Sequence, residues 1–281
     1  MGEVIRVTDP GDPRLGDYAC LSDPQLRKRY EHDVGVFIAE GPNVVRELVA
    51  SDYRTKSLLL MPHRLDDLAG EIAAVDGPVF VADRELVREV VRFPNHQGAL
   101  GCGHRRPLAT PDEVLAGAGT VVVLEETNDP ANLGAIFRSA RALHVDAVLL
   151  GPRCADPLYR RTVRTSMGHV LHVPYAPLGD VDAGLADLRA RGFRILALTP
   201  DPDAADLGAL PPLDRVALLL GAEGPGLSEG ALAGADLAVR IPMAASVDSL
   251  NVAVTAGIAF DALRRARDRT PAVPPSPSRP R

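Results

Sequence analysis

The sequence lacks several features that mark specialised classes of protein. It has no Trp among its 281 residues, and aromatic residues make up only 4%. Its three cysteines, Cys20, Cys102 and Cys154, are far apart and odd in number, so neither a disulfide framework nor a zinc or redox spacing is predicted. Free thiols in a reducing cytoplasm are expected instead. Apolar runs such as 216–220 fall far short of the ~20 residues that span a bilayer, which excludes a membrane-spanning helix.

Targeting signals are also missing from the beginning of the chain. Residues 1–6 contain no basic region followed by an apolar stretch, so no secretory signal is expected. Position six is Arg6 rather than the Ser or Thr of a myristoylation site. The remaining composition, 46% hydrophobic and 24% charged, is typical of a globular protein. The length fits one large domain or two modest ones.

Positive charge is not in surplus, since the formal net charge is −6. This balance argues weakly against a nucleic-acid partner, because phosphate contacts need local positive charge. The basic residues are nearly all Arg, however, and they gather in short clusters at 27–29, 105–106, 138–141 and 160–164. The planar guanidinium suits bidentate recognition of phosphate. A GC-rich genome would produce the same excess of Arg, and composition alone leaves both explanations open.

Hydrophobic patterning predicts two alternating α/β segments. Residues 1–16 are expected to form an irregular lead-in, 17–106 a small α/β module, 107–119 a linker, 120–268 a second α/β domain, and 269–281 a disordered tail. The expected strands are 36–40, 57–61, 79–81, 120–124, 147–150, 170–173, 193–198, 216–220 and 237–241. The expected helices are 23–30, 43–50, 84–91, 132–143, 159–168, 181–191 and 250–267. Strands that alternate with helices predict a mostly parallel sheet.

Three segments rich in polar residues or glycine follow strands of the second domain. Ligands of open parallel sheets bind at the carboxyl ends of the strands, so these segments are candidate binding loops. In the first segment, residues 125–140, Asn132 is expected as the N-cap of a helix that also carries Arg138. The two side chains lie about 120° apart around the helix axis, so only the shape of a cleft would bring them together. Taken alone, this segment also fits a capped helix with an exposed arginine.

The other two segments are equally ambiguous when each is considered separately. Residues 221–228 contain three glycines but match neither the dinucleotide fingerprint nor a phosphate-binding P-loop. In residues 240–254, Ser249 is expected as an N-cap and Asn251 in the first helical turn. A glycine-rich turn and an ordinary loop before an amphipathic helix would explain the same residues.

Together and in this order, the three segments resemble the signature motifs of the SpoU/TrmH family of RNA ribose 2′-O-methyltransferases. The motifs are Asn132-x-Gly134-x-x-x-Arg138, Gly221-x-Glu223-Gly224-x-Gly226, and Ile241-Pro242-Met243 followed by Ser249-Leu250-Asn251. The match runs from about Thr120 to Phe260. In the first module, Phe37-Ile38-Ala39-Glu40-Gly41 and His96-Gln97-Gly98 look like the family's L30e-like substrate-binding domain.

The resemblance implies an α/β fold, a mostly parallel sheet with a carboxyl-terminal deep trefoil knot, preceded by the L30e-like domain. It also implies S-adenosylmethionine as methyl donor, RNA as partner, a homodimer with active sites near the subunit interface, and no metal or membrane. By resemblance, the catalytic residues are Arg138, Asn132, Glu223, Ser249 and Asn251. The predicted cofactor-binding residues are Gly221, Ile241, Leu250, Leu220, Met243, Leu198 and Thr199.

A guanidinium stays protonated past pH 12, so Arg138 is expected to fix the ribose-phosphate and stabilise the forming alkoxide rather than to act as a base. Glu223 is expected to orient Arg138 or Asn132. The residues expected to contact RNA are Arg105, Arg106, Arg160, Arg161 and His96.

A separate first module favours 23S ribosomal RNA as the target over transfer RNA. Three alternatives remain: a tRNA 2′-O-methyltransferase, a catalytically silent RNA-binding or ribosome-assembly protein, and a nucleotide-dependent oxidoreductase. The missing dinucleotide fingerprint disfavours the last of these.

Overall fold

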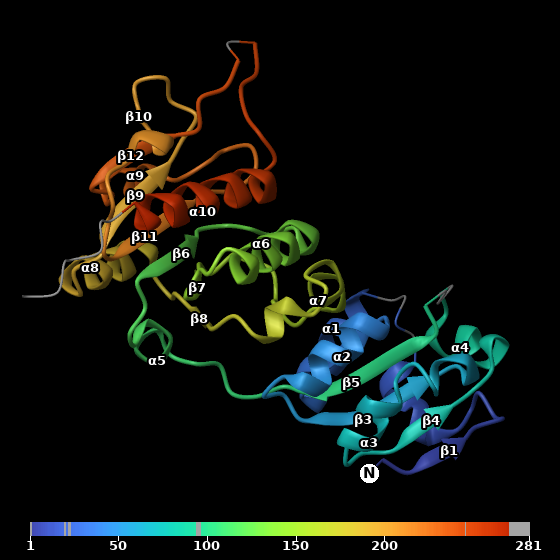
Figure 1. Ribbon diagram of the computed structural model, residues 1–281. Helices are drawn as coiled ribbons and strands as arrows, with labels where there is room; N and C mark the ends of the chain where they lie inside the picture. The colour runs from blue at the N-terminus through green and yellow to red at the C-terminus, as the bar shows by residue number, and fades with distance from the viewer. Residues whose placement is uncertain (1, 20, 22–23, 94–96, 245, 270–281) are drawn as a thin grey trace, which may run out of the picture.

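The computed structural model describes residues 2–19, 21, 24–93, 97–244 and 246–269, which form two β-sheets at opposite ends of an elongated molecule (Figure 1). The first sheet has five strands in the order β1-β4-β3-β5-β2. Their bounds are β1 (Val4–Arg6), β2 (Val36–Glu40), β3 (Thr55–Leu60), β4 (Val79–Val81) and β5 (Ala99–His104). The β5 strand runs antiparallel to β2 and β3, whereas β4 runs parallel to β1 and β3.

Four helices accompany this sheet: α1 (Pro24–Val34), α2 (Pro42–Ala50), α3 (Ala69–Ala74) and α4 (Arg84–Val91). The period-two alternation of β2 divides its side chains between two apolar clusters. Val36 and Ile38 pack in the cluster that includes α4, whereas Phe37 and Ala39 pack toward the second domain. The first module therefore has its own core and also shares apolar surface with its neighbour.

The second sheet has seven strands in the order β10-β12-β9-β11-β6-β7-β8, and every pairing in its described part is parallel. The strands are β6 (Thr120–Leu124), β7 (Ala147–Leu150), β8 (Tyr175–Pro177), β9 (Arg194–Leu198), β10 (Ala205–Asp206), β11 (Val216–Leu220) and β12 (Leu237–Arg240). This arrangement confirms the expected mostly parallel sheet. The central strand β11 is buried along its whole length, because helices cover both faces.

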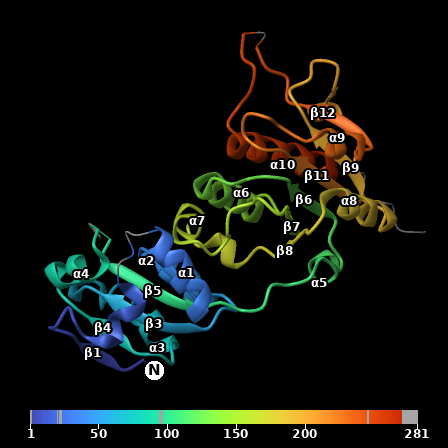
Figure 2. The same cartoon turned by 180° about the vertical axis from the view of Figure 1, so that it is seen from behind.

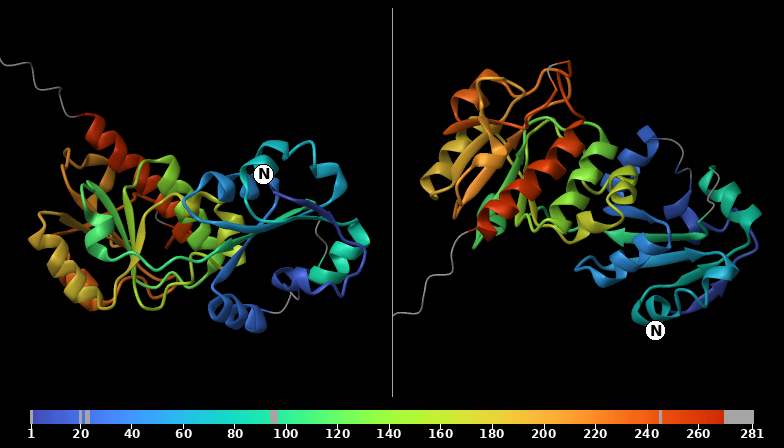
Figure 3. Two further views of the ribbon diagram at one scale, coloured as in Figure 1. Left: turned by 90° about the horizontal axis from the view of Figure 1, so that it is seen from below. Right: turned by 45° about the horizontal axis from the view of Figure 1, so that its top comes forward.

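Helices cover the second sheet on two sides (Figure 2). The bounds are α5 (Pro111–Leu115), α6 (Pro130–Ala142), α7 (Arg160–Thr165), α8 (Val181–Ala190), α9 (Glu229–Ala233) and α10 (Val252–Asp268). Side chains of α6, α7 and α10 share one apolar cluster, whereas those of α5, α8 and α9 share the other. The two long helices α6 and α10 lie side by side on the first of these faces (Figure 3).

The secondary structure expected for three segments was wrong. The lead-in is not irregular throughout, because β1 pairs with β4 at the edge of the first sheet. The linker contains α5, which begins with a capping box between Thr110 and Glu113. The strand expected at 170–173 is a 3₁₀ turn, since Gly168 enters it with φ of 85° and Pro174 follows it. The tail at 270–281 lies outside the described residues.

The two domains meet through ion pairs, one of them on a buried carboxylate, as well as through apolar contacts. The Glu40 carboxylate at the end of β2 is 5% exposed and accepts a 2.6 Å hydrogen bond from Arg160 and a 3.3 Å bond from Arg164. In a second pair, Arg105 donates to Asp156 at 2.6 Å. Charges withdrawn from water need close partners, so these pairs favour one orientation of the domains. Among the described residues, no helix is long and apolar enough to cross a membrane, and no group of side chains could hold a metal ion.

Candidate functional site

A cavity of about 330 Å³ opens where β9, β11 and β12 end, and it is called here the strand-end cavity. Four segments line it: the end of β9, the glycine loop after β11, the segment after β12, and the first turn of α10. The lining residues are Leu198, Thr199, Pro200, Leu220, Gly221, Ala222, Glu223, Gly224, Gly226, Ile241, Met243, Ser249, Leu250, Asn251, Val252 and Thr255. All seven residues predicted to bind the cofactor are among them.

The glycine loop forms a narrow backbone hairpin at one wall of the cavity. Ala222 and Gly226 exchange two backbone hydrogen bonds of 3.0 and 3.1 Å. Gly224 and Gly226 have φ of 91° and 76°, which glycine adopts at little cost. A Cβ on Gly221 would overlap the backbone of Gly226 and Leu227. The loop therefore has no room for a side chain at position 221, and it presents main-chain groups to the cavity.

The side-chain amide of Asn251 joins the three sequence motifs at the edge of the cavity. Its Nδ2 donates to Asn132 Oδ1 at 3.0 Å and to Glu223 Oε1 at 2.9 Å. Its Oδ1 accepts hydrogen bonds from the backbone of Ala253 and Val254 at 3.0 and 3.3 Å. One side chain therefore begins α10 and links α6 to the glycine loop, across 119 residues of sequence from Asn132.

Two expected helix caps were assigned to the wrong residues. Asp129, not Asn132, caps α6, and its carboxylate accepts bonds from Ala131 N and Asn132 N at 2.6 and 3.0 Å. Pro at the first helical position, Pro130, suits this earlier start, because its missing N–H and fixed φ fit there. Asn251, not Ser249, caps α10. The earlier cap of α6 leaves the Asn132 side chain available for the bond with Asn251.

A second link ties the end of β6 to the glycine loop. The Glu125 carboxylate is 8% exposed and accepts a 2.9 Å hydrogen bond from the backbone N–H of Ser228. Ser228 also caps the short helix α9 through a 3.1 Å bond from Ala231 N. The loop between Gly221 and Ser228 is therefore fixed at both ends.

Arg138 does not line the cavity of its own chain. It lies on the exposed face of α6, and within the described ranges its side chain makes no hydrogen bond or ion pair. It is close enough to His169 to help lower the pKa of that imidazole, after the larger effect of burial. Its absence from the cavity that Asn132 borders agrees with the separation of the two residues by about 120° around the helix axis.

The predicted RNA-contacting residues fall into three groups. Arg105 and Arg160 are engaged within the chain, since each donates at 2.6 Å to an interdomain carboxylate. These partners correct the expectation that both guanidinium groups are available for phosphate. Arg106 is half-exposed and Arg161 is exposed. His96 lies outside the described residues.

Sequence reasoning missed some residues of the cavity. Pro200, Ala222 and Thr255 line it but were not predicted. Thr255 stands four residues after Asn251, so helical spacing could have placed both on one face. Pro200 follows β9 directly, where a strand-end loop was already expected.

Comparison with known proteins agrees with this geometry. Residues 119–261 match the SpoU rRNA Methylase family. A protein of Mycobacterium tuberculosis described as an uncharacterized tRNA/rRNA methyltransferase is 45% identical over 261 residues, which cover 92% of this chain and 91% of that protein. The 23S rRNA (guanosine(2553)-2′-O)-methyltransferase RlmP of Bacillus subtilis is 34% identical over 239 residues, covering 84% of this chain and 92% of that protein.

Solved structures extend the similarity to the fold of both domains. The AdoMet-bound rRNA methyltransferase from Sinorhizobium meliloti superposes with a TM-score of 0.79 at 27% identity, over 94% of this chain and 98% of that one. The SpoU methyltransferase AviRb from Streptomyces viridochromogenes, at 23% identity, shares the fold with a TM-score of 0.75 over 92% of this chain and 99% of that one. These matches confirm the resemblance predicted from the three motifs, and the chain belongs to the SpoU rRNA methylase family.

Proposed function

We propose that this chain is an S-adenosylmethionine-dependent methyltransferase that modifies a ribose 2′-hydroxyl of RNA, with 23S ribosomal RNA as its target. The observation that carries the proposal is the Asn251 bridge, which brings Asn132, Glu223 and the glycine loop to one cavity. The similarity to RlmP supports the 2′-hydroxyl and the 23S RNA. Similarity to the AdoMet-bound rRNA methyltransferase supports the cofactor.

The strand-end cavity fits S-adenosylmethionine in size and chemistry. Its volume of about 330 Å³ lies in the range of small-molecule pockets. Apolar side chains of Leu198, Leu220, Ile241 and Leu250 suit an adenine ring, and the absence of a Cβ at Gly221 lets the glycine loop close against its own backbone at the cavity wall. When bound, S-adenosylmethionine supplies a methyl group already activated by a sulfonium. The remaining work is to position the acceptor hydroxyl and to stabilise the charge that its oxygen gains.

The Arg138 guanidinium is suited to stabilising the charge on that oxygen. It does not line the cavity of its own chain, so it could act only at the cavity of another subunit. We infer that the protein is a homodimer in which the partner subunit's Arg138 faces this cavity. Four exposed apolar side chains in and before α10 support an interface there: Val247 at 45%, Leu250 at 38%, Val254 at 54% and Ile258 at 42% exposure. The guanidinium then holds the ribose-phosphate and stabilises the alkoxide, Asn251 orients Glu223 and Asn132, and Ser249 lies at the cavity edge.

The rest of the architecture follows from the same proposal. The first module acts as an L30e-like RNA-binding domain over residues 17–106, the catalytic domain spans 120–268, and the segment after β12 forms the family's trefoil knot. Threading of that segment through a loop is consistent with its place beside the ends of β9 and β11. We place the enzyme in the cytoplasm, where its RNA substrate and reduced thiols occur.

Two measurements test the proposed function. S-adenosylmethionine should bind the purified protein and NAD should not, and 2′-O-methylation should be missing at one site of 23S RNA in a strain without the gene. Methylation of transfer RNA instead would correct the substrate, and cofactor binding without any methyl transfer would indicate a silent RNA-binding protein.

Mixed dimers test the shared site. Homodimers of Arg138→Ala and homodimers of Gly221→Ala should each be inactive. If cavity and arginine come from different subunits, a mixed dimer has one intact site, because the Arg138→Ala subunit supplies the cavity and the Gly221→Ala subunit supplies the arginine, so mixing should restore activity. No recovery on mixing would refute the shared site.

A further inference from the structure

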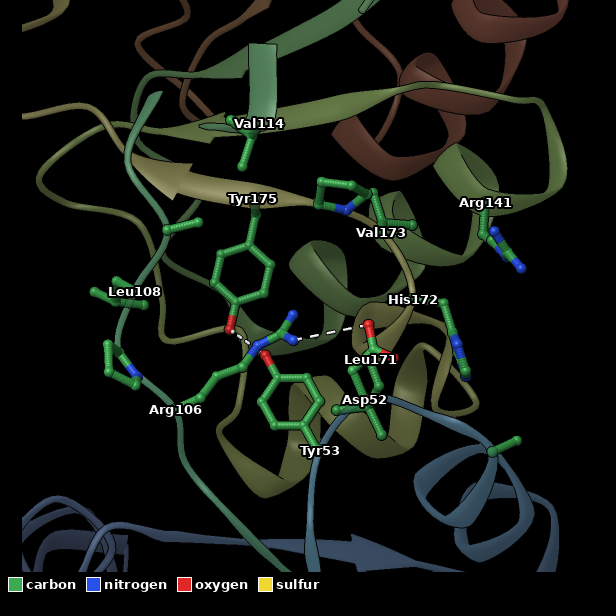
Figure 4. A pocket seen from close by; sticks show the side chains of 14 residues that line it. Asp52, Tyr53, Arg106, Leu108, Val114, Arg141, Leu171, His172, Val173 and Tyr175 are labelled. Carbon is green, nitrogen blue, oxygen red and sulfur yellow. Dashed lines mark hydrogen bonds and ion pairs between the residues drawn. The ribbon is translucent and has the colours of Figure 1, made fainter. Parts of the chain in front are cut away.

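A second cavity, of about 240 Å³, lies between the two domains, and it is called here the junction pocket (Figure 4). The first module contributes Asp52, Tyr53 and, at its end, Arg106, and the catalytic domain contributes Arg141, His172 and Tyr175. Its volume is below the roughly 300–1,000 Å³ of pockets for drug-sized molecules, so it fits a single base or ribose-phosphate unit.

The pocket combines aromatic rings with a guanidinium. Arg106 stacks over the Tyr53 ring with its Cζ 4.4 Å from the centroid, as Figure 4 shows. The Tyr53 and Tyr175 hydroxyls lie 3.2 Å apart, and the Phe37 ring supports Tyr53 edge-on at 5.3 Å between centroids. Burial raises the pKa of Tyr175 well above its usual value, which favours its neutral hydroxyl. The stack holds the guanidinium plane in a fixed orientation.

The cations of the pocket are not neutralised within the chain. Arg106 is 51% exposed, and its ion pair with Asp52 is long, at 3.9 Å, to a carboxylate that is 93% exposed and fully hydrated. Arg141 is exposed and makes no ion pair or hydrogen bond in the described part of the chain. By contrast, Arg160 holds the buried carboxylate of Glu40, and Arg105 holds the partly buried carboxylate of Asp156, each across the domain interface. Of the arginines at the domain junction, Arg106 and Arg141 therefore remain available to a ligand.

One residue that lines the pocket, Arg141, stands on the same helix as the arginine assigned to catalysis. Arg138 and Arg141 stand three residues apart on α6, on the same face of the helix. Both lie near His169, because after burial each contributes to lowering the pKa of its imidazole. A single RNA strand held by Arg138 can therefore extend past Arg141 into the junction pocket.

We propose that the junction pocket binds one nucleotide of the RNA substrate, next to the nucleotide that is methylated. Arg106 and Arg141 hold its phosphates, and its base stacks on the guanidinium of Arg106. Cationic grooves with stacking platforms are the general means of binding single-stranded nucleic acid. The inference rests on the proposed function and adds a substrate subsite outside the three motifs.

The test compares Arg106→Gln, Arg141→Gln and a matched control, Arg194→Gln. Arg194 is exposed too, but it begins β9, four strands from β8 in the sheet order. Binding of a fluorescent, mixed-sequence single-stranded RNA should weaken about tenfold in each pocket variant and stay unchanged in the control. The slope of log affinity against log salt should also fall by about 0.7 for each phosphate that the variant no longer binds. Titration with S-adenosylmethionine should give wild-type affinity in all three.

Arg106→Lys separates the effect of charge from that of stacking, because lysine keeps the positive charge but lacks the planar guanidinium on which a base could stack. The proposal expects a wild-type salt slope with weakened binding, and full affinity in this variant would overturn the stacked base. If wild type binds RNA and cofactor while the pocket variants equal Arg194→Gln, the subsite is wrong and the proposed function stands. If wild type binds neither ligand, the proposed function fails and the subsite with it.

Discussion

Replacing Asn251 by Ser or by Ala separates two tasks that this one side chain performs. Its Oδ1 caps α10 through bonds from Ala253 N and Val254 N, and its Nδ2 bridges Asn132 and Glu223. Ser caps a helix about as well as Asn but is too short to make the bridge. Ala does neither. The two variants therefore share the loss of the bridge and differ in the loss of the cap.

The expected magnitudes follow from these four bonds. Both variants lose the two bridging bonds, each of which contributes about 0.5–1.5 kcal/mol. Asn251→Ala loses the cap as well, so its free energy of unfolding should be lower than that of Asn251→Ser by about 1 kcal/mol. For a domain of this size that difference lowers the melting temperature by about 2–4 °C. Methyl transfer should fall by roughly 10- to 100-fold in both, because the polar groups at the cavity lose their fixed positions.

Urea denaturation and incorporation of labelled methyl groups into ribosomal RNA measure the two effects. Asp180→Ala is the matched control, because Asp180 caps α8 through a 2.7 Å bond from Ala183 N, away from the cavity. It should lose about 1 kcal/mol of stability and no activity. Wild-type transfer by Asn251→Ser would refute the role of the bridge. Equal loss of transfer in Asp180→Ala would show that activity simply follows stability.

Three further predictions concern the cavity, the domain interface and pH. Gly221→Ala should abolish S-adenosylmethionine binding in a calorimetric titration because its Cβ overlaps the backbone, whereas Gly70→Ala, in open space, should not. Glu40→Ala leaves two arginines without their shared carboxylate, and should lower the free energy of unfolding in urea by about 1.5–3 kcal/mol. Burial lowers the pKa of His104 and His169, so unfolding takes up protons, and the urea midpoint should fall as pH drops below about 6.5; a flat profile would contradict this.

Much of the second sheet could be predicted because its strands are continuous β-branched or apolar runs, as at β6 and β11. The β5 strand could not, since its sequence contains Gly101 and Gly103, which weaken a strand by local propensity. In the structure, a Cβ at either position would press on Leu48 or Phe37. Close packing against β2 and α2 therefore requires glycine at these two positions, and the same glycines lower the strand propensity from which β5 would have been predicted.

The sequence indicated which residues gather at the candidate site, but not how their side chains are oriented or paired. The residues that the family resemblance assigned to the cofactor line one cavity, because the ends of parallel strands meet at one edge of the sheet. The direction of Arg138 depends on which face of α6 is covered, and that follows from packing against α10. The partnership of Glu40 with Arg160 joins residues 120 apart in sequence, and no local pattern could reveal it.

The Glu40 ion pairs also bear on how such enzymes can be recombined. A carboxylate that is 5% exposed and held by two guanidinium groups from α7 cannot be left alone without cost. Fusing the first module to the catalytic domain of a different methyltransferase would leave the Glu40 carboxylate without its partners, unless α7 were transferred as well. A chimaera joined within the connecting segment should therefore carry α7 together with the first module, so that Glu40 keeps both of its arginine partners.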